Sequence, residues 1–254
     1  MDNITHTLIG ITLAKALPQK TQGAARAAVW TAVIGSNLPD LDFLQSVAVG
    51  GGKLAYLLYH RGHTHTLWFT VIGAVISAFA GVKLGKLHPS RWPEFFILGW
   101  VACLLHIAAD FGNNYGVHPF APFYGKWFYG DAIFIVEPLI WLALLPLAFS
   151  ESLSRTARIA CATLWVGLLG LLWFGPFMPW QLTAGISVWA LIVGSLQLKL
   201  KGAKVAVAAA LAVVSVFVIQ SWRAKRLVTS ALDAQAPIES VRQLVVTPAP
   251  GNPW

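Results

Sequence analysis

Charged residues are scarce in this chain. Asp, Glu, Lys and Arg make up 11% of its 254 residues, against about 25% in a typical soluble domain. Apolar side chains make up 57% of the chain, which excludes an ordinary soluble domain and predicts an integral membrane protein. The 12 tryptophans fit that class, because indole rings favour the membrane interface.

Cysteine is also rare, since the chain contains only Cys103 and Cys161. Each lies inside an apolar run, so we expect buried, unreactive thiols and no disulfide framework. The first residues lack the basic region of a cleaved signal peptide, because Asp2 and His6 stand where Lys or Arg is expected. We therefore expect His6 to remain in the mature protein.

Basic residues outnumber acidic ones, and the formal net charge is +8. The Lys and Arg side chains are scattered singly between apolar runs, which argues against a nucleic-acid partner. The run Gly50-Gly51-Gly52 is not followed by the Lys-Ser/Thr of a phosphate-binding loop, so a nucleotide is not expected either. The expected partner is membrane lipid.

Eight apolar segments are candidates to span, or nearly span, the hydrocarbon core of roughly 30 Å. The first two are short and close at Pro18 and Pro39, because proline discourages helix in the residue before it. The segments cover residues 4–17, 24–38, 67–84, 95–110, 132–149, 159–177, 181–198 and 205–222. We predict an all-α, polytopic membrane helix bundle of about seven or eight hydrophobic segments.

The distribution of Lys and Arg between loops predicts the orientation. Loops on one side hold eleven of them, whereas loops on the other side hold Lys53, Arg61 and Lys126. By the positive-inside rule, the side with eleven is cytoplasmic. Six of the seven histidines and six of the ten acidic residues then fall on the outer side. Random placement would split them about evenly, so we expect a site on that face.

Three imidazoles lie within six residues, in His60-Arg61-Gly62-His63-Thr64-His65. Gly62 would let a short non-helical turn aim several imidazole nitrogens at one point, and neutral imidazole is the commonest metal ligand. Asp40 and Asp42, some twenty residues earlier, can supply hard oxygen ligands. The histidines alone fit a solvated polar turn at the membrane surface equally well, and Asp42 also fits the N-cap of a following helix.

His106 and Asp110 are four residues apart, so they share one face of a helix at a spacing suited to a single ion. Ionisable groups near the end of a span usually face the protein interior or a watery cavity. A His–Asp hydrogen bond that stabilises helix packing is the alternative.

Mixed His and Asp ligands, more than four in number, indicate one divalent ion with an open position, or two ions bridged by a hydroxide. Zinc is favoured and manganese is the alternative. Such a centre lowers the pKa of bound water and directs hydroxide at an ester or phosphoester. Arg61 would clamp an anionic oxygen; pairing with a lipid phosphate at the interface is the other role that suits it.

Four elements of the sequence carry a resemblance to a known family. They are Asn37-Leu-Pro-Asp-Leu-Asp42, His60-Arg-Gly-His-Thr-His65-Thr-Leu, Leu105-His-Ile-Ala-Ala-Asp110-Phe and an early His6. Together they resemble the YdjM/YbcI-like family of membrane-bound, metal-dependent hydrolases, over roughly residues 1–140. The resemblance implies a multi-pass inner-membrane protein whose metal ligands are His6, Asp40, Asp42, His60, His65, His106 and Asp110. His63 falls where the family pattern tolerates other residues.

We therefore expect a membrane-bound, metal-dependent hydrolase that acts on a small-molecule or lipid ester or phosphoester. Arg61 would steady the developing anion, and Asp42 or Glu137 would act as the base. The alternatives are a metal transporter or metal sensor with the same ligands, and a purely structural protein without metal. A transporter would want ionisable residues near the midplane on several helices, yet 159–177, 181–198 and 205–222 contain no Asp, Glu or His.

The chain is expected to divide into three parts. Residues 1–149 would form the metal-site membrane domain, 150–222 additional transmembrane helices, and 223–254 a polar C-terminal tail. The proline-rich end of that tail fits either a disordered terminus or the lead-in to a further domain, in which case the tail is truncated here.

Overall fold

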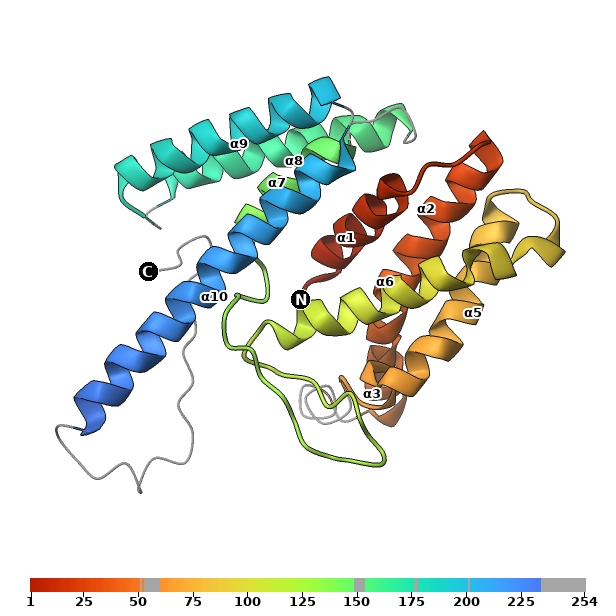
Figure 1. Ribbon diagram of the computed structural model, residues 1–254, viewed down its shortest axis with the longest axis horizontal. Helices are drawn as coiled ribbons and strands as arrows, with labels where there is room; N and C mark the ends of the chain where they lie inside the picture. Colours follow the sequence, from red (N-terminus) through yellow and green to blue (C-terminus); the bar gives the residue numbers. More distant parts are fainter. Residues whose placement is uncertain (51, 53–59, 149–153, 176–177, 201, 234–254) are drawn as a thin grey trace.

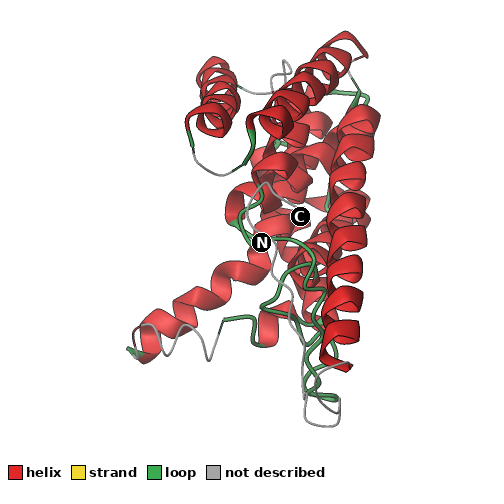
Figure 2. Cartoon of the chain, turned by 90° about the vertical axis from the view of Figure 1, so that its left-hand side faces the viewer, coloured by secondary structure: helices red, strands yellow, loops and turns green. Residues whose placement is uncertain are grey.

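The computed structural model describes residues 1–50, 52, 60–148, 154–175, 178–200 and 202–233. The described residues form helices joined by loops and contain no strand (Figure 2), so the all-α prediction is confirmed. The helices are α1 (Asn3–Ala16), α2 (Gln22–Asn37), α3 (Phe43–Val49), α5 (Leu67–Leu84), α6 (Pro93–Phe111), α7 (Pro138–Ala148), α8 (Arg155–Phe174), α9 (Trp180–Leu200) and α10 (Ala203–Asp233). Short 3₁₀ turns are η1 (Leu38–Asp42), η2 (His63–His65) and η3 (Pro89–Arg91).

Five helices of the described residues, α5, α6, α8, α9 and α10, are long and apolar enough to cross a membrane. The chain is therefore a multi-pass membrane protein, but the predicted count of seven or eight segments is too high. The helices α1, α2 and α7 have 14, 16 and 11 residues, and 11 residues extend only about 17 Å. Most of the apolar side chains of α7 are buried against neighbouring helices, which explains why this segment has the composition of a span.

The helices α1, α2, α5 and α6 pack together in one group (Figure 1). Their contacts are lined by small buried residues, which let helices approach closely in a membrane. These residues include Ala24, Ala27, Ala28, Ala32, Ala78 and Ala102. Because α2 and α5 lie side by side, the turn η1 that follows α2 contacts the turn η2 that precedes α5. This contact brings two of the polar motifs together.

The helices α7, α8, α9 and α10 form a second group around buried Leu142, Leu145, Leu168 and Phe217. The loop after α6 is tied to α10, since Ser221 donates to the carbonyl oxygen of Asp131 and Lys225 pairs with its carboxylate at 3.1 Å. The first part of the predicted tail, residues 223–233, belongs to α10, and the rest of that tail lies outside the described residues. The division of the chain into three parts stays a prediction.

Gly81 lies where α5 crosses α2. A Cβ added there would lie 2.8 Å from both the carbonyl oxygen of Ala27 and the backbone nitrogen of Thr31, and closer still to the Thr31 hydroxyl. We expect Gly81→Ala to destabilise the protein by about 1–3 kcal/mol, as overpacking does, in thermal unfolding measured in detergent. The control is Gly167→Ala in α8, where an added Cβ meets no atom of the described residues within 4 Å. Equal stability of the two variants would contradict this packing.

Candidate metal centre

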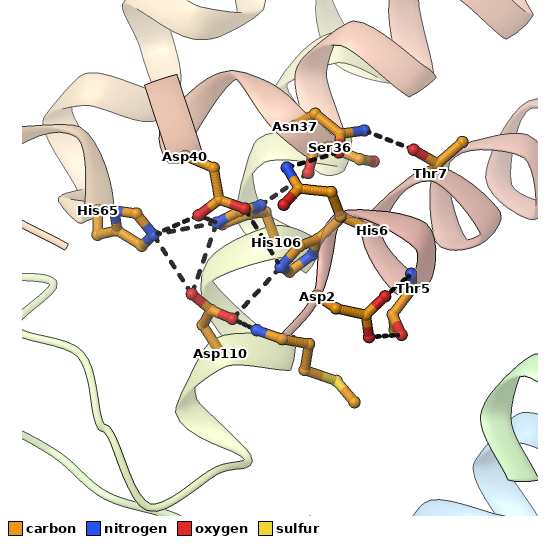
Figure 3. Close-up of polar contacts among 12 residues, drawn as sticks. Asp2, Thr5, His6, Thr7, Ser36, Asn37, Asp40, His65, His106 and Asp110 are labelled. Carbon is orange, nitrogen blue, oxygen red and sulfur yellow. Dashed lines mark hydrogen bonds and ion pairs between the residues drawn. The ribbon is translucent and has the colours of Figure 1, made fainter. Parts of the chain in front are cut away.

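Four buried side chains meet where η1, η2 and the end of α6 come together. They are Asp40, His65, His106 and Asp110, and each offers one ligand atom within 4.8 Å of the others (Figure 3). His65 Nε2 lies 3.4 Å from Asp40 Oδ1 and 3.3 Å from Asp110 Oδ2. His106 Nε2 lies 3.5 Å and 3.6 Å from the same two oxygens. The two imidazole nitrogens are 3.1 Å apart.

These spacings fit a divalent ion. Zinc lies about 2.0–2.2 Å from its nitrogen and oxygen ligands, which places the ligand atoms of a tetrahedral site about 3.3 Å apart. Asp110 is fully buried, and within the described residues neither of its carboxylate oxygens accepts a hydrogen bond of good geometry, although Arg61 Nε and the Met1 α-amino group lie against it. A buried carboxylate is costly unless a cation balances it. The group therefore has the spacing and the charge that a metal ion requires.

The ring nitrogens that face away from the group are held in place. His106 Nδ1 lies 2.7 Å from the carbonyl oxygen of Ser36. Because that oxygen can only accept, we assign the proton to Nδ1, and Nε2 presents its lone pair to the centre. His65 Nδ1 lies 3.3 Å from Asp42 Oδ2. Contacts of this kind fix the orientation of metal-binding imidazoles.

Asp42 holds the histidine turn rather than joining the four-residue group. Its carboxylate lies 2.9 Å from His60 Nδ1 and accepts from the Arg61 backbone nitrogen at 2.6 Å and from the Thr64 hydroxyl at 3.0 Å. Burial alone would raise the pKa of Asp42, but the hydrogen bonds and charges of His60 and His65 outweigh it and lower the pKa below its ordinary value. Asp42 is therefore ionised at neutral pH.

We expect Asp42→Asn to weaken metal binding by about 10- to 100-fold, the usual effect of losing a group that orients a ligand. The amide keeps the shape of the side chain but loses the charge that faces His60 and His65. Competition with a chromogenic chelator in detergent measures the affinity. Asp131→Asn changes another buried carboxylate, which pairs with Lys225, and should bind metal as the wild type does. Equal affinities of both variants would contradict the role of Asp42.

Arg61 connects the histidine turn to the end of α6. It is 3% exposed and adopts a left-handed backbone conformation with φ 61°. Its Nε lies 3.0 Å from Asp110 Oδ2, and its Nη1 donates to the carbonyl oxygen of Gly116 at 2.7 Å and to Asn113 Oδ1 at 3.1 Å. Arg61 therefore balances part of the charge of Asp110 and fixes the loop that follows α6.

His6 reaches the group from α1. Its Nε2 lies 3.3 Å from Asp110 Oδ1 and 3.9 Å from Asp40 Oδ2, and its ring stacks on His106 with centroids 3.8 Å apart. The α-amino group of Met1 also contacts Asp110 Oδ1. Asp2 caps α1 by accepting from the backbone nitrogens of Ile4 and Thr5, which fixes the start of the helix that carries His6.

The other predicted residues lie outside the four-residue group. Of the seven predicted ligands, Asp40, His65, His106 and Asp110 form the group and His6 lies against it, whereas Asp42 and His60 lie one layer further out. His63 is exposed. Glu137 is fully buried and accepts from the backbone nitrogen of Leu139 at the start of α7. Sequence reasoning missed Thr64 and the Ser36 carbonyl; only Thr64, beside His65, had a signal in the motif.

A cavity of about 710 Å³ adjoins the centre. Its lining includes Asp40, Phe43, His60, Arg61 and Tyr115. His6, His65, His106 and Asp110 are 0% exposed, whereas Asp40 is 8% exposed. A molecule in the cavity would therefore reach the group at Asp40.

Comparisons with known proteins agree with the motifs. Residues 1–182 match the family described as YdjM inner membrane protein. The uncharacterized protein YfhP of Bacillus subtilis (strain 168) is 27% identical over 153 residues, which are 56% of this chain and 44% of that protein. The chain thus spans less than half the length of this relative. No solved structure matches the chain.

The family match covers most of the chain and contains every residue of the candidate metal centre. The resemblance that the sequence motifs indicated is confirmed. This chain belongs to the YdjM inner membrane protein family.

Proposed function

We propose that the protein is a membrane-bound, metal-dependent hydrolase that cleaves an ester or phosphoester of a membrane lipid. The observation that carries this proposal is the convergence of buried imidazoles and carboxylates beside a cavity. Ionisable groups are costly near a membrane span unless they serve a site.

Zinc suits this group better than manganese does. The spacings of 3.1–3.6 Å match the edge of a tetrahedron around an ion with short bonds, and imidazole is a common zinc ligand, whereas manganese favours oxygen ligands in an octahedron. A zinc ion held there supplies Lewis-acid chemistry, because it polarises an ester oxygen and lowers the pKa of a water to about 7.

Residues around the group can supply the general base and the positive charge that hydrolysis requires. His60 lines the cavity and its Nδ1 is held by Asp42, so we propose that His60 accepts the proton from the attacking water, with Asp42 stabilising the resulting imidazolium. Arg61 also lines the cavity and places positive charge beside the position of an anionic phosphate. Glu137, the other base expected from the sequence, is not among the described residues that line this cavity.

A second, apolar cavity favours a lipid substrate. It has a volume of about 760 Å³, and its lining includes Ile9, Leu105, Ile133 and Val214. Met1 lines both cavities. A lipid would therefore place its polar head beside Asp40 and an acyl chain in the apolar cavity.

The centre lies beside the first residues of α5, which follow the turn η2, and beside the last residues of α6, which include Asp110. The opposite ends of these helices carry Lys83, Lys86 and Arg91. By the positive-inside rule those ends are cytoplasmic, so we propose that the centre is at the outer face of the inner membrane.

The test compares turnover with transport. Purified full-length protein, loaded with zinc, is incubated with vesicles of phosphatidylglycerol and phosphatidylethanolamine, and mass spectrometry follows the lipid products. We expect zinc-dependent hydrolysis in the wild type and in His63→Ala, and none in His65→Ala. Zinc uptake into vesicles that contain the protein, without turnover of either lipid, would overturn the hydrolase in favour of a transporter.

A further inference from the structure

Both carboxylates of the centre have imidazoles on two sides. Asp40 Oδ1 and Asp110 Oδ2 face His65 and His106. The other oxygen of each carboxylate, Asp40 Oδ2 and Asp110 Oδ1, faces His6 Nε2 at 3.9 Å and 3.3 Å (Figure 3). A carboxylate that presents one oxygen to His65 and His106 and the other to His6 is placed to bridge two ions.

The packing of His6 on His106 leaves both of its ring nitrogens without a hydrogen bond among the described residues. The His6 side chain is 0% exposed, so no bulk solvent replaces the missing partners. Buried polar atoms without partners are rare, and each costs about 1–3 kcal/mol. The His6 ring lies nearly parallel to that of His106, with an interplanar angle of 21°, so the two rings approach the carboxylates side by side. A cation beside His6 Nε2 would satisfy both the imidazole and Asp110 Oδ1.

We infer that the centre holds two divalent ions, the first bound by His65 and His106 and the second by His6, with Asp40 and Asp110 bridging them. The second position deepens the proposed function, because it rests on the metal site of that hydrolase. Pairs of ions in phosphoester hydrolases lie about 3.5–4 Å apart and stabilise both the attacking and the leaving oxygen. The nitrogen of Met1 contacts Asp110 Oδ1, so it would share this oxygen with the second ion.

Charge makes the two positions unequal. Among the side chains, Asp40, Asp42 and Asp110 carry three negative charges and Arg61 carries one positive charge, so the first ion neutralises their sum of minus two. The α-amino group of Met1, which contacts Asp110, adds no negative charge. A second ion adds positive charge that these side chains do not balance. The second ion should therefore bind more weakly than the first, and inorganic phosphate should strengthen its binding by supplying negative charge.

Calorimetric titration of the metal-free, full-length protein with zinc tests this inference. We expect two equivalents in the wild type, with the second affinity at least 10-fold lower than the first and raised by inorganic phosphate. His6→Gln keeps much of the side-chain volume and should bind one equivalent. His88→Gln, which changes an exposed histidine between α5 and α6, should bind two.

The possible outcomes distinguish a failure of the second metal position from a failure of the proposed hydrolase. One equivalent in both the wild type and His6→Gln would refute the second ion and leave the hydrolase intact. Two equivalents in His6→Gln would refute the role of His6, and no binding in the wild type would refute the metal site itself. Electron paramagnetic resonance of the wild type saturated with manganese tests the same inference without a variant. The signal of a spin-coupled pair supports two ions, whereas the six-line signal of isolated ions refutes the second ion.

Discussion

His65→Ala should lose the bound ion, whereas His63→Ala should keep it. The two histidines lie in the same short turn, η2, but His65 is buried with its Nε2 toward Asp40 and Asp110 and His63 is exposed. Zinc held by four side chains gains roughly 10–16 kcal/mol, so losing one ligand costs about 3 kcal/mol. The affinity should fall on the order of 10²-fold or more.

Elemental analysis of both variants after dialysis measures this difference. His63→Ala is a matched control, because it removes an imidazole from the same turn without changing the four-residue group. Retention of the full metal content by His65→Ala, or equal loss from both variants, would show that the ion is bound elsewhere.

Arg61→Ala should destabilise the fold by about 3–5 kcal/mol, the usual cost of removing one partner from a buried ion pair. The guanidinium lies 3.0 Å from Asp110 Oδ2 and also donates to two groups of the following loop. Its removal leaves the carboxylate of Asp110 buried with less positive charge around it. Chemical unfolding in detergent, followed by circular dichroism, measures the loss.

Zinc should restore part of that stability, because the ion balances the same carboxylate. The loss in Arg61→Ala should therefore be larger in metal-free protein than in zinc-saturated protein. Arg61→Lys should recover only part of it, since an ammonium group cannot reproduce the planar set of donors that reaches Asp110 and Gly116. A loss of activity in Arg61→Ala without any change in stability would contradict the structural part of its role.

The fold class could be predicted from the sequence because long apolar segments of low charge indicate membrane helices. Each predicted apolar segment overlaps a helix of the structure. The sequence did not distinguish a span from a buried apolar helix, because α7 owes its leucines to contacts with α8, α9 and α10. Only packing separates the two cases.

The convergence of the polar motifs was predictable in outline, since loop parity put them on one side of the membrane. Which carboxylate lies innermost was not predictable. Asp40 and Asp42 are two residues apart in one 3₁₀ turn, and Asp40 faces the group while Asp42 faces His60 and Thr64. The left-handed backbone of Arg61 and the Ser36 carbonyl that holds His106 likewise follow from tertiary contacts rather than from residue type.

The most direct test is anomalous diffraction at the zinc absorption edge from crystals of the full-length protein grown with zinc. We predict a peak between Asp40, His65, His106 and Asp110, about 2.0–2.2 Å from the Nε2 atoms of both histidines. A zinc-saturated crystal with these four side chains ordered and no peak within coordinating distance of them would contradict the metal centre.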